Sequence, residues 1–226
     1  MNKLLTIGLV ALSTRAYTQT PPAELWIGAN VTVAFQNQWQ WHNDAGYRTN
    51  GVNLVPHQYL YRTGIRKIFS TKWNAAAGAA FFSTRISYNK ADHEFGNEYR
   101  AWQEVNHQHE WKNGFSLQNR FRIEERFFEE VSTRDAYKAL RLRYRIGFTK
   151  RFSEKWTVQI ADEYMRQLQQ RQFLLNQNRT LVSLGHDLKK HVQLQAVYIW
   201  QQRPTGSQHI LALLFQKTIT ANGNKN

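Results

Sequence analysis

A two-residue alternation of apolar and polar side chains runs along most of the chain and constrains its fold more than any other feature. In residues 115–128, five of seven positions on one face are apolar, against one of seven on the other face. Residues 138–149 repeat this pattern, with Leu140, Leu142 and Phe148 on one face and Arg141, Arg143 and Arg145 on the other. Successive side chains of a β-strand point to opposite faces, whereas a helix would scatter these arginines around its circumference. The alternation therefore predicts two-sided β-strands.

Similar runs follow one another along the chain, and most hold ten to thirteen residues. A tilted strand needs about 9–11 residues to cross a bilayer, whereas strands of soluble domains are commonly near 5–6. The order predicts a single up-and-down antiparallel transmembrane β-barrel of 10–12 strands, an all-β fold. Eleven runs are visible, and an even number would require one fewer or one more. With ten strands, both termini would lie at the same end of the barrel. The expected runs are 25–35, 38–48, 58–69, 73–86, 97–109, 115–127, 137–149, 156–166, 178–187, 191–201 and 208–219.

The first eighteen residues have the layout of a secretory signal peptide. Lys3 supplies a positive charge, residues 4–12 form an apolar run, and a polar, small-residue segment follows. We expect cleavage after Thr18, which leaves residues 19–226 as a single outer-membrane barrel domain. An N-terminal core strand or helix is the alternative interpretation of this segment.

Composition narrows the remaining classes of protein. Cysteine is absent, which excludes disulfide frameworks and thiolate metal sites, and no apolar run reaches the length of a membrane helix. The net charge of +14 with 14% aromatic residues suits either a nucleic-acid-binding protein or a membrane barrel, whose two faces cancel in an average hydropathy. Arginines and most aromatic residues occupy opposite faces of the same runs, so we expect no nucleic-acid partner.

The expected connections alternate between short and longer segments, as in outer-membrane barrels. Longer loops are expected at 49–57, 87–96, 128–136, 167–177 and 202–207. Aromatic rings flank the short turns, as expected for residues at the level of lipid headgroups. These rings are Trp39, Phe69, Trp73, Trp111, Phe115 and Trp156.

The polar face of the runs contains nine arginines and four glutamates that the barrel interpretation places in the lumen. Side chains on one face of neighbouring strands are adjacent, and arginine suits bidentate pairing with carboxylates. One hypothesis is a structural ladder that satisfies itself, and the other is a site for a small anionic ligand, since arginines outnumber glutamates. The set is Arg62, Arg66, Glu98, Arg100, Glu104, Arg120, Arg122, Glu124, Arg126, Arg141, Arg143, Arg145 and Glu163.

Catalysis and metal binding are not expected. His107 and His109 share a strand face, but no third ligand is evident from the sequence. Ser83 or Ser87 with His93 would suit an outer-membrane lipid hydrolase, yet no triad motif supports that alternative. We therefore expect no cofactor, no metal and no catalytic residue.

An ordered set of short motifs resembles a Bacteroidota outer-membrane family catalogued as domain of unknown function 2490. The motifs are Arg120-x-Arg122-x-Glu124-x-Arg126, Glu98-x-Arg100, Arg141-x-Arg143-Tyr144-Arg145, Gln177-Asn178-Arg179, Trp26 and Tyr47-Arg48. The resemblance covers nearly all of the mature chain and implies an outer-membrane β-barrel. It implies no catalytic residue and no particular ligand.

The sequence thus predicts an exported outer-membrane barrel with a structural role, or with a narrow lumen that prefers anions. Its expected partners are outer-membrane lipid and a small anionic ligand, and its oligomeric state is left open. A soluble periplasmic, lipocalin-like binding protein is the main alternative, because alternation does not say which face is inside.

Overall fold

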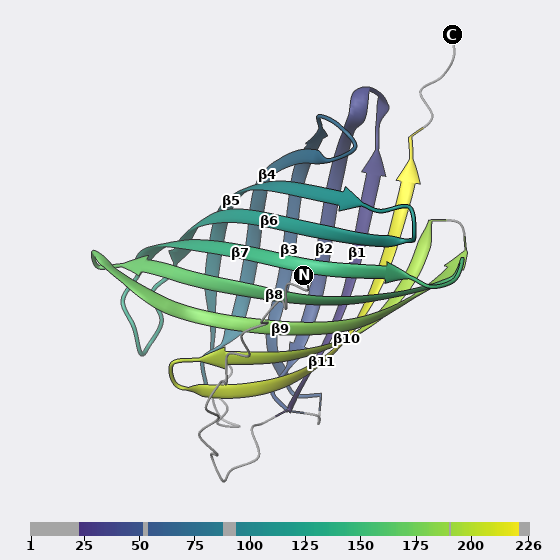
Figure 1. The fold of residues 1–226 in the computed structure, drawn as a ribbon. Helices are drawn as coiled ribbons and strands as arrows, with labels where there is room; N and C mark the ends of the chain where they lie inside the picture. The colour runs from purple at the N-terminus through teal and green to yellow at the C-terminus, as the bar shows by residue number, and fades with distance from the viewer. Residues whose placement is uncertain (1–22, 52–53, 88–93, 190, 222–226) are drawn as a thin grey trace, which may run out of the picture.

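A computed structural model describes residues 23–51, 54–87, 94–189 and 191–221 as one closed barrel (Figure 1). The expected signal peptide lies outside these residues. No helix within them is long and apolar enough to cross a membrane. The strands are β1 (Ala23–Ala34), β2 (Trp39–Thr49), β3 (Pro56–Ile68), β4 (Trp73–Arg85), β5 (Phe95–Glu110), β6 (Phe115–Phe128), β7 (Tyr137–Arg151), β8 (Trp156–Gln169), β9 (Gln172–Lys189), β10 (Val192–Arg203) and β11 (Gly206–Thr220), with a short 3-10 turn η1 (Gln36–Gln38).

The barrel has eleven strands and closes through a parallel pair. Each strand is antiparallel to its neighbours in the chain, but β1 pairs with β11 in parallel, from Ala23 opposite His209 to Ala34 opposite Thr220. A meander with an odd number of strands requires this parallel closure, since its first and last strands run in the same direction. The prediction of eleven runs is therefore right, and the even count is wrong. Ala23 and Thr220 lie at opposite ends of the barrel, which corrects the arrangement expected for ten strands.

The connections differ from the predicted ones at two places. The loops expected at 167–177 and 202–207 are two-residue turns, because β8, β9, β10 and β11 extend further than the sequence indicated. Gln170 and Arg171 both have positive φ, 48° and 63°. Two central residues with positive φ match the twist of a tight antiparallel hairpin, although glutamine and arginine are not residue types that predict such a turn. The longer connections around 50–55, 86–94 and 129–136 define the end that we name the long-loop end; the opposite end is the short-turn end.

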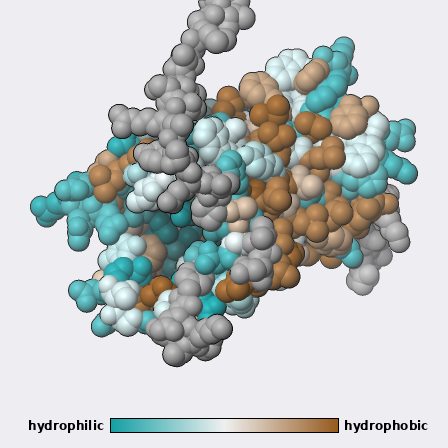
Figure 2. Space-filling model, turned by 90° about the horizontal axis from the view of Figure 1, so that it is seen from below, coloured by the Kyte–Doolittle hydropathy of each residue, from teal (hydrophilic) through white to brown (hydrophobic). Residues whose placement is uncertain are grey.

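The apolar face of the strands lies outside. Phe148, Ile160 and Leu211 are each at least 54% exposed, far more than a water-soluble protein of this size would leave. Figure 2 shows hydrophobic side chains gathered in a band over the outer wall, with hydrophilic side chains toward its two ends. The six rings beside the short turns are exposed as predicted. The fold is thus a transmembrane β-barrel, and its orientation is opposite to that of a lipocalin-like carrier.

Two apolar clusters lie inside the barrel. In the first, the Trp102 ring sits directly over Gly64 and Gly78, where an added Cβ would fall 2.4 Å and 2.8 Å from Trp102 Cζ2. Only glycine leaves room for the ring against the backbone of β3 and β4. The second cluster, on β10 and β11, joins Val197, Ile199, Ile210 and Ala212. Since barrel interiors are usually polar, these clusters set apart two stretches of the inner wall.

Candidate functional site: an arginine-rich lumen

Glu124 on β6 is the centre of an ionic network inside the barrel. Its carboxylate is 2% exposed and accepts hydrogen bonds from Arg141, with Nε at 2.8 Å, and from Arg143, with Nη1 at 2.7 Å. Arg122 and Arg100 approach it to 3.6 and 3.7 Å. One carboxylate therefore has guanidinium groups from β5, β6 and β7 around it.

Glu163 on β8 makes the second centre. Arg143 donates to both of its oxygens, at 2.8 and 2.9 Å, and Arg120 donates to Oε1 at 2.5 Å. Arg179 of β9 lies 4.0 Å away. Arg143 bridges Glu124 and Glu163, so the two centres form one continuous network.

Glu98 and Glu104 on β5 extend the network toward the two ends of the barrel. Glu98 accepts bonds of 2.5 Å from both Arg100 and Arg126. Glu104 accepts a bond of 2.8 Å from Arg122 Nε, and Arg66 lies 3.6 Å from it. Glu98 and Glu104 are each 5% exposed, as expected for charges enclosed by the barrel wall.

The structure thus brings eleven of the thirteen residues singled out from the sequence into one network. The two others lie on the same inner face but have different partners. Arg62 pairs with Asp44 of β2. Arg145 donates to the side-chain oxygen of Gln159 at 2.6 Å and has no ion pair among the described residues.

Guanidinium groups outnumber carboxylates throughout this network. Four glutamates are shared by eight arginines: Arg66, Arg100, Arg120, Arg122, Arg126, Arg141, Arg143 and Arg179. Among the described residues, Arg66 Nε, Arg120 Nε and Arg122 Nη1 are buried without a hydrogen-bond partner. Buried donors in native proteins are rarely left unpaired. The lumen therefore has more positive charge and more N–H donors than its own acceptors satisfy.

Two cavities occupy the lumen. The one at the long-loop end, which we name the long-loop chamber, has a volume of about 570 Å³, and its lining includes Arg48, Arg62, Arg126 and Arg179. The one at the short-turn end, the short-turn chamber, has a volume of about 530 Å³ and is lined mainly by Asn, Gln and Thr side chains. Seven residues line both chambers: Asn30, Arg120, Arg145, Gln159, Ser183, Gln195 and Leu214. A solute crossing the barrel would therefore pass between two guanidinium groups, on β6 and β7, and a wall of uncharged side chains.

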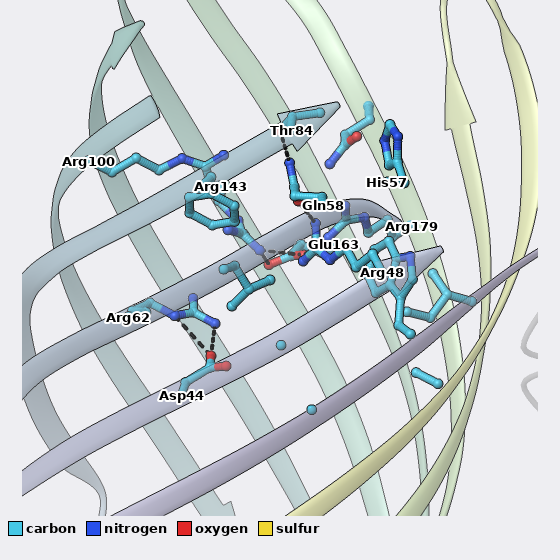
Figure 3. Close-up of a pocket in the computed structure, with 18 of the residues that line it drawn as sticks. Asp44, Arg48, His57, Gln58, Arg62, Thr84, Arg100, Arg143, Glu163 and Arg179 are labelled. Carbon is cyan, nitrogen blue, oxygen red and sulfur yellow. Dashed lines mark hydrogen bonds and ion pairs between the residues drawn. The ribbon is translucent and has the colours of Figure 1, made fainter. Parts of the chain in front are cut away.

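The set predicted from the sequence lacks five charged residues of the long-loop chamber: Asp44, Arg48, Arg134, Arg179 and Arg203. Figure 3 shows Arg48 and Arg179 close to Glu163, with the Arg62–Asp44 pair farther down the wall. Arg48 and Arg179 occur in motifs that carried the family resemblance. Alternation along β2 and β9 places both side chains on the inner face, and this alternation was the only feature of the sequence that could have identified them.

The paired histidines and the hydrolase candidates are the other residues singled out from the sequence. The His107 and His109 rings contact Trp73 and Trp111, with centroids 4.5 and 4.6 Å apart. No group of three or more metal-ligating side chains occurs within residues 23–51, 54–87, 94–189 and 191–221. His93 lies outside the described residues, so its pairing with Ser83 or Ser87 stays an untested alternative to the expectation of no catalytic residue.

Comparison with solved structures finds a porin and an outer-membrane protein, both at low sequence identity. The NanC porin aligns with a TM-score of 0.49 and 11% identity, over 76% of this chain and 78% of the porin. The outer-membrane OmpT of Vibrio cholerae aligns with a TM-score of 0.40 and 15% identity, over 73% of this chain and 53% of OmpT. A loop L8 deletion mutant of that OmpT gives 0.42 and 15% identity, over 74% and 55%. This chain thus spans about half the length of OmpT.

Comparison with curated proteins finds no match. A protein family does match, over residues 23–209, which include ten complete strands and the start of β11. That span contains every member of the ionic network. The chain belongs to the family described as protein of unknown function DUF2490.

Proposed function

We propose that this protein is an exported outer-membrane barrel whose narrow lumen binds or passes small anions. The observation that carries the proposal is the surplus of guanidinium groups in the lumen, where eight arginines share four glutamates. Pores lined with arginine or lysine favour anions because the ions replace lost hydration with charge-assisted contacts.

The packing of the lumen supports a narrow passage rather than a wide channel. Trp102 fills the inside of β3, β4 and β5, and the ion pairs of Glu124 and Glu163 occupy the inner face of β6, β7 and β8. Barrels of eight strands are filled by side chains and those of sixteen or more hold water channels, so eleven strands fall between these limits. We expect a small conductance.

Recording from the purified protein in planar bilayers tests this proposal. With a KCl gradient across the bilayer, the reversal potential should have the sign of chloride selectivity, and the conductance per barrel should be low. A large, cation-selective conductance would refute the arginine-lined passage.

A purely structural role is the second candidate, and the buried ion pairs favour it. Each network glutamate contacts at least two arginines, so the lumen could serve only to hold the wall together. A barrel that carries no measurable current and binds no anion would support this role instead.

Export and taxonomic origin complete the proposal. The charged start, apolar run and small-residue segment of residues 1–18 support a signal peptide that is cleaved after Thr18. The motif resemblance supports an origin in the outer membrane of Bacteroidota. Mass spectrometry of the intact mature protein from outer-membrane fractions should give a chain beginning at Gln19; a soluble periplasmic chain would contradict the proposal.

A further inference from the structure

The long-loop chamber contains two arginines that the ionic network leaves largely uncompensated. Arg48 donates to the Gln58 side-chain oxygen at 2.6 Å, and its guanidinium lies 3.9 Å from the centre of the Trp26 ring. It forms no ion pair within the described residues. Arg179 lies 5.1 Å from the same ring and donates to Gln201 at 2.7 Å.

The carboxylates that line this chamber have other partners. Asp44 pairs with Arg62, Glu98 with Arg100 and Arg126, and Glu163 with Arg120 and Arg143. Arg48 therefore has no acid partner among the described residues, and Arg179 has only Glu163, at 4.0 Å.

The wall beside these arginines is apolar, which is unusual for a barrel interior. Leu181, Val197, Ala212 and Leu214 line the chamber together with Trp26. The strand register places Trp26 opposite Ala212, Ala212 opposite Val197, and Gly28 opposite Leu214. This apolar wall therefore runs past the Trp26 ring, from Leu181 on its long-loop side to Leu214 on its short-turn side.

We propose that the long-loop chamber is a binding site for an amphipathic anion, with a carboxylate or phosphate head and a short apolar body. The head binds Arg48 and Arg179 beside the Trp26 ring, and the body lies along Val197, Ala212 and Leu214. A volume of about 570 Å³ lies within the usual range for small-ligand pockets. The inference rests on the proposed function in assigning the lumen to anions, and it adds the chemical class of the ligand.

Two features of the wall make an apolar body preferable to a purely hydrophilic anion. A hydrophilic anion would leave Val197 and Leu214 facing water, whereas an alkyl chain removes that surface from water. Gly28 presents no side chain at this level, and a Cβ there would come within 3.0 Å of the Leu214 side chain. The Leu214 side chain therefore packs directly over Gly28 and forms part of the apolar surface that an alkyl chain would cover.

Binding of labelled octanoate to the barrel in nanodiscs of zwitterionic lipid tests the proposal. Equilibrium dialysis with empty nanodiscs as the reference separates site binding from partition into lipid. We expect saturable binding of one octanoate per barrel. Excess acetate should displace it only at far higher concentration, and octanol, which has the chain without the charge, should displace it weakly.

Three variants separate the head site from the wall. Arg48→Gln and Arg179→Gln should each weaken octanoate binding by about tenfold or more, since each removes charge-assisted hydrogen bonds. Leu214→Gln should weaken octanoate binding severalfold and leave the competing effect of acetate unchanged. Arg151→Gln is the matched control, because Arg151 is an exposed arginine paired with Asp187 at the short-turn end, and it should bind octanoate normally.

Several outcomes would overturn the proposal. If Arg48→Gln and Arg179→Gln bind octanoate as well as Arg151→Gln does, Arg48 and Arg179 are not part of the binding site. Displacement by acetate at the same concentration as octanoate would indicate a simple anion site, and equal displacement by octanol would indicate a simple apolar one. Bilayer recordings report independently on the passage of anions. A barrel that binds octanoate without conducting would therefore refute the proposed passage of anions but not the proposed binding site.

Discussion

Removing the charge of Glu124 should destabilise the barrel more than any other single-carboxylate change. In Glu124→Gln, the amide oxygen can still accept one hydrogen bond, but the NH₂ group faces a guanidinium. Hydrogen bonds to charged groups contribute about 1.5–3 kcal/mol each. Losing at least one of the three hydrogen bonds that Arg141 and Arg143 donate, together with the neutralising charge, should cost about 2–4 kcal/mol.

The assay is the temperature at which the unboiled gel shift is lost in a neutral detergent. About 2–4 °C per kcal/mol applies to chains of 150–250 residues, so Glu124→Gln should lower this temperature by about 5–15 °C. Glu125→Gln is the matched control, since Glu125 is the next residue, is exposed, and faces outward between Ala101 and Leu140. It should change the temperature by no more than about 2 °C.

A double variant tests the cause of this destabilisation. If the cost arises from an uncompensated guanidinium, adding Arg141→Gln to Glu124→Gln should cost much less than Arg141→Gln alone. Equal melting of Glu124→Gln and Glu125→Gln would refute the reasoning, because it would mean that water already screens the network.

The other predictions concern the outer wall, the tight packing inside and one loop contact. Leu213→Arg, at a site 44% exposed to lipid, should cost about 2–4 kcal/mol in refolding titrations, whereas Thr149→Arg, in the short-turn chamber, should cost clearly less; equal costs would reverse the assignment of faces. Gly78→Ala should destabilise the barrel by at least about 1–3 kcal/mol, because its Cβ would lie 2.0 Å from the Thr63 backbone oxygen; normal melting would contradict that close approach. Hydrogen bonds from Ser132 hold the pKa of Glu94 below its ordinary value, so this contact stabilises the fold above the ordinary pKa and is lost as the pH falls through the lowered one. Carbon NMR should show a higher pKa of Glu94 in Ser132→Ala than in the unchanged protein. An unchanged pKa would contradict the contact between Ser132 and Glu94.

The ionic network shows how far local pattern reaches into this fold. Arg120, Arg122, Glu124 and Arg126 share one face of β6 because strand side chains alternate, and this holds whatever the rest of the chain does. The pairing of Glu163 with arginines of β6 and β7 depends on register between strands, which alternation alone does not define. The sequence therefore predicted eleven of the twelve members of the network, all but Arg179, but not which charges meet.

The apolar wall of the long-loop chamber was beyond prediction for a related reason. On β10 both faces are partly apolar, with Val197 and Ile199 inside and Tyr198 and Trp200 on the other face. Alternation distinguishes the inner face from the outer face only where one face is polar, so the sequence of β10 does not show which of its faces is inside. Arg48 and Arg179 meet at Trp26 only after the barrel closes, since they come from β2 and β9.

By itself, the sequence determined the fold class, the position of nearly every strand and the face on which the arginines lie. These properties follow from period-two alternation and run length, which are local. Only the tertiary structure decided the odd strand number, the parallel closure of β1 on β11 and the two-residue turns after β8 and β10. Closure joins residues about 186 positions apart, Ala23 and His209, and no local pattern in either strand specifies a partner so distant in the chain.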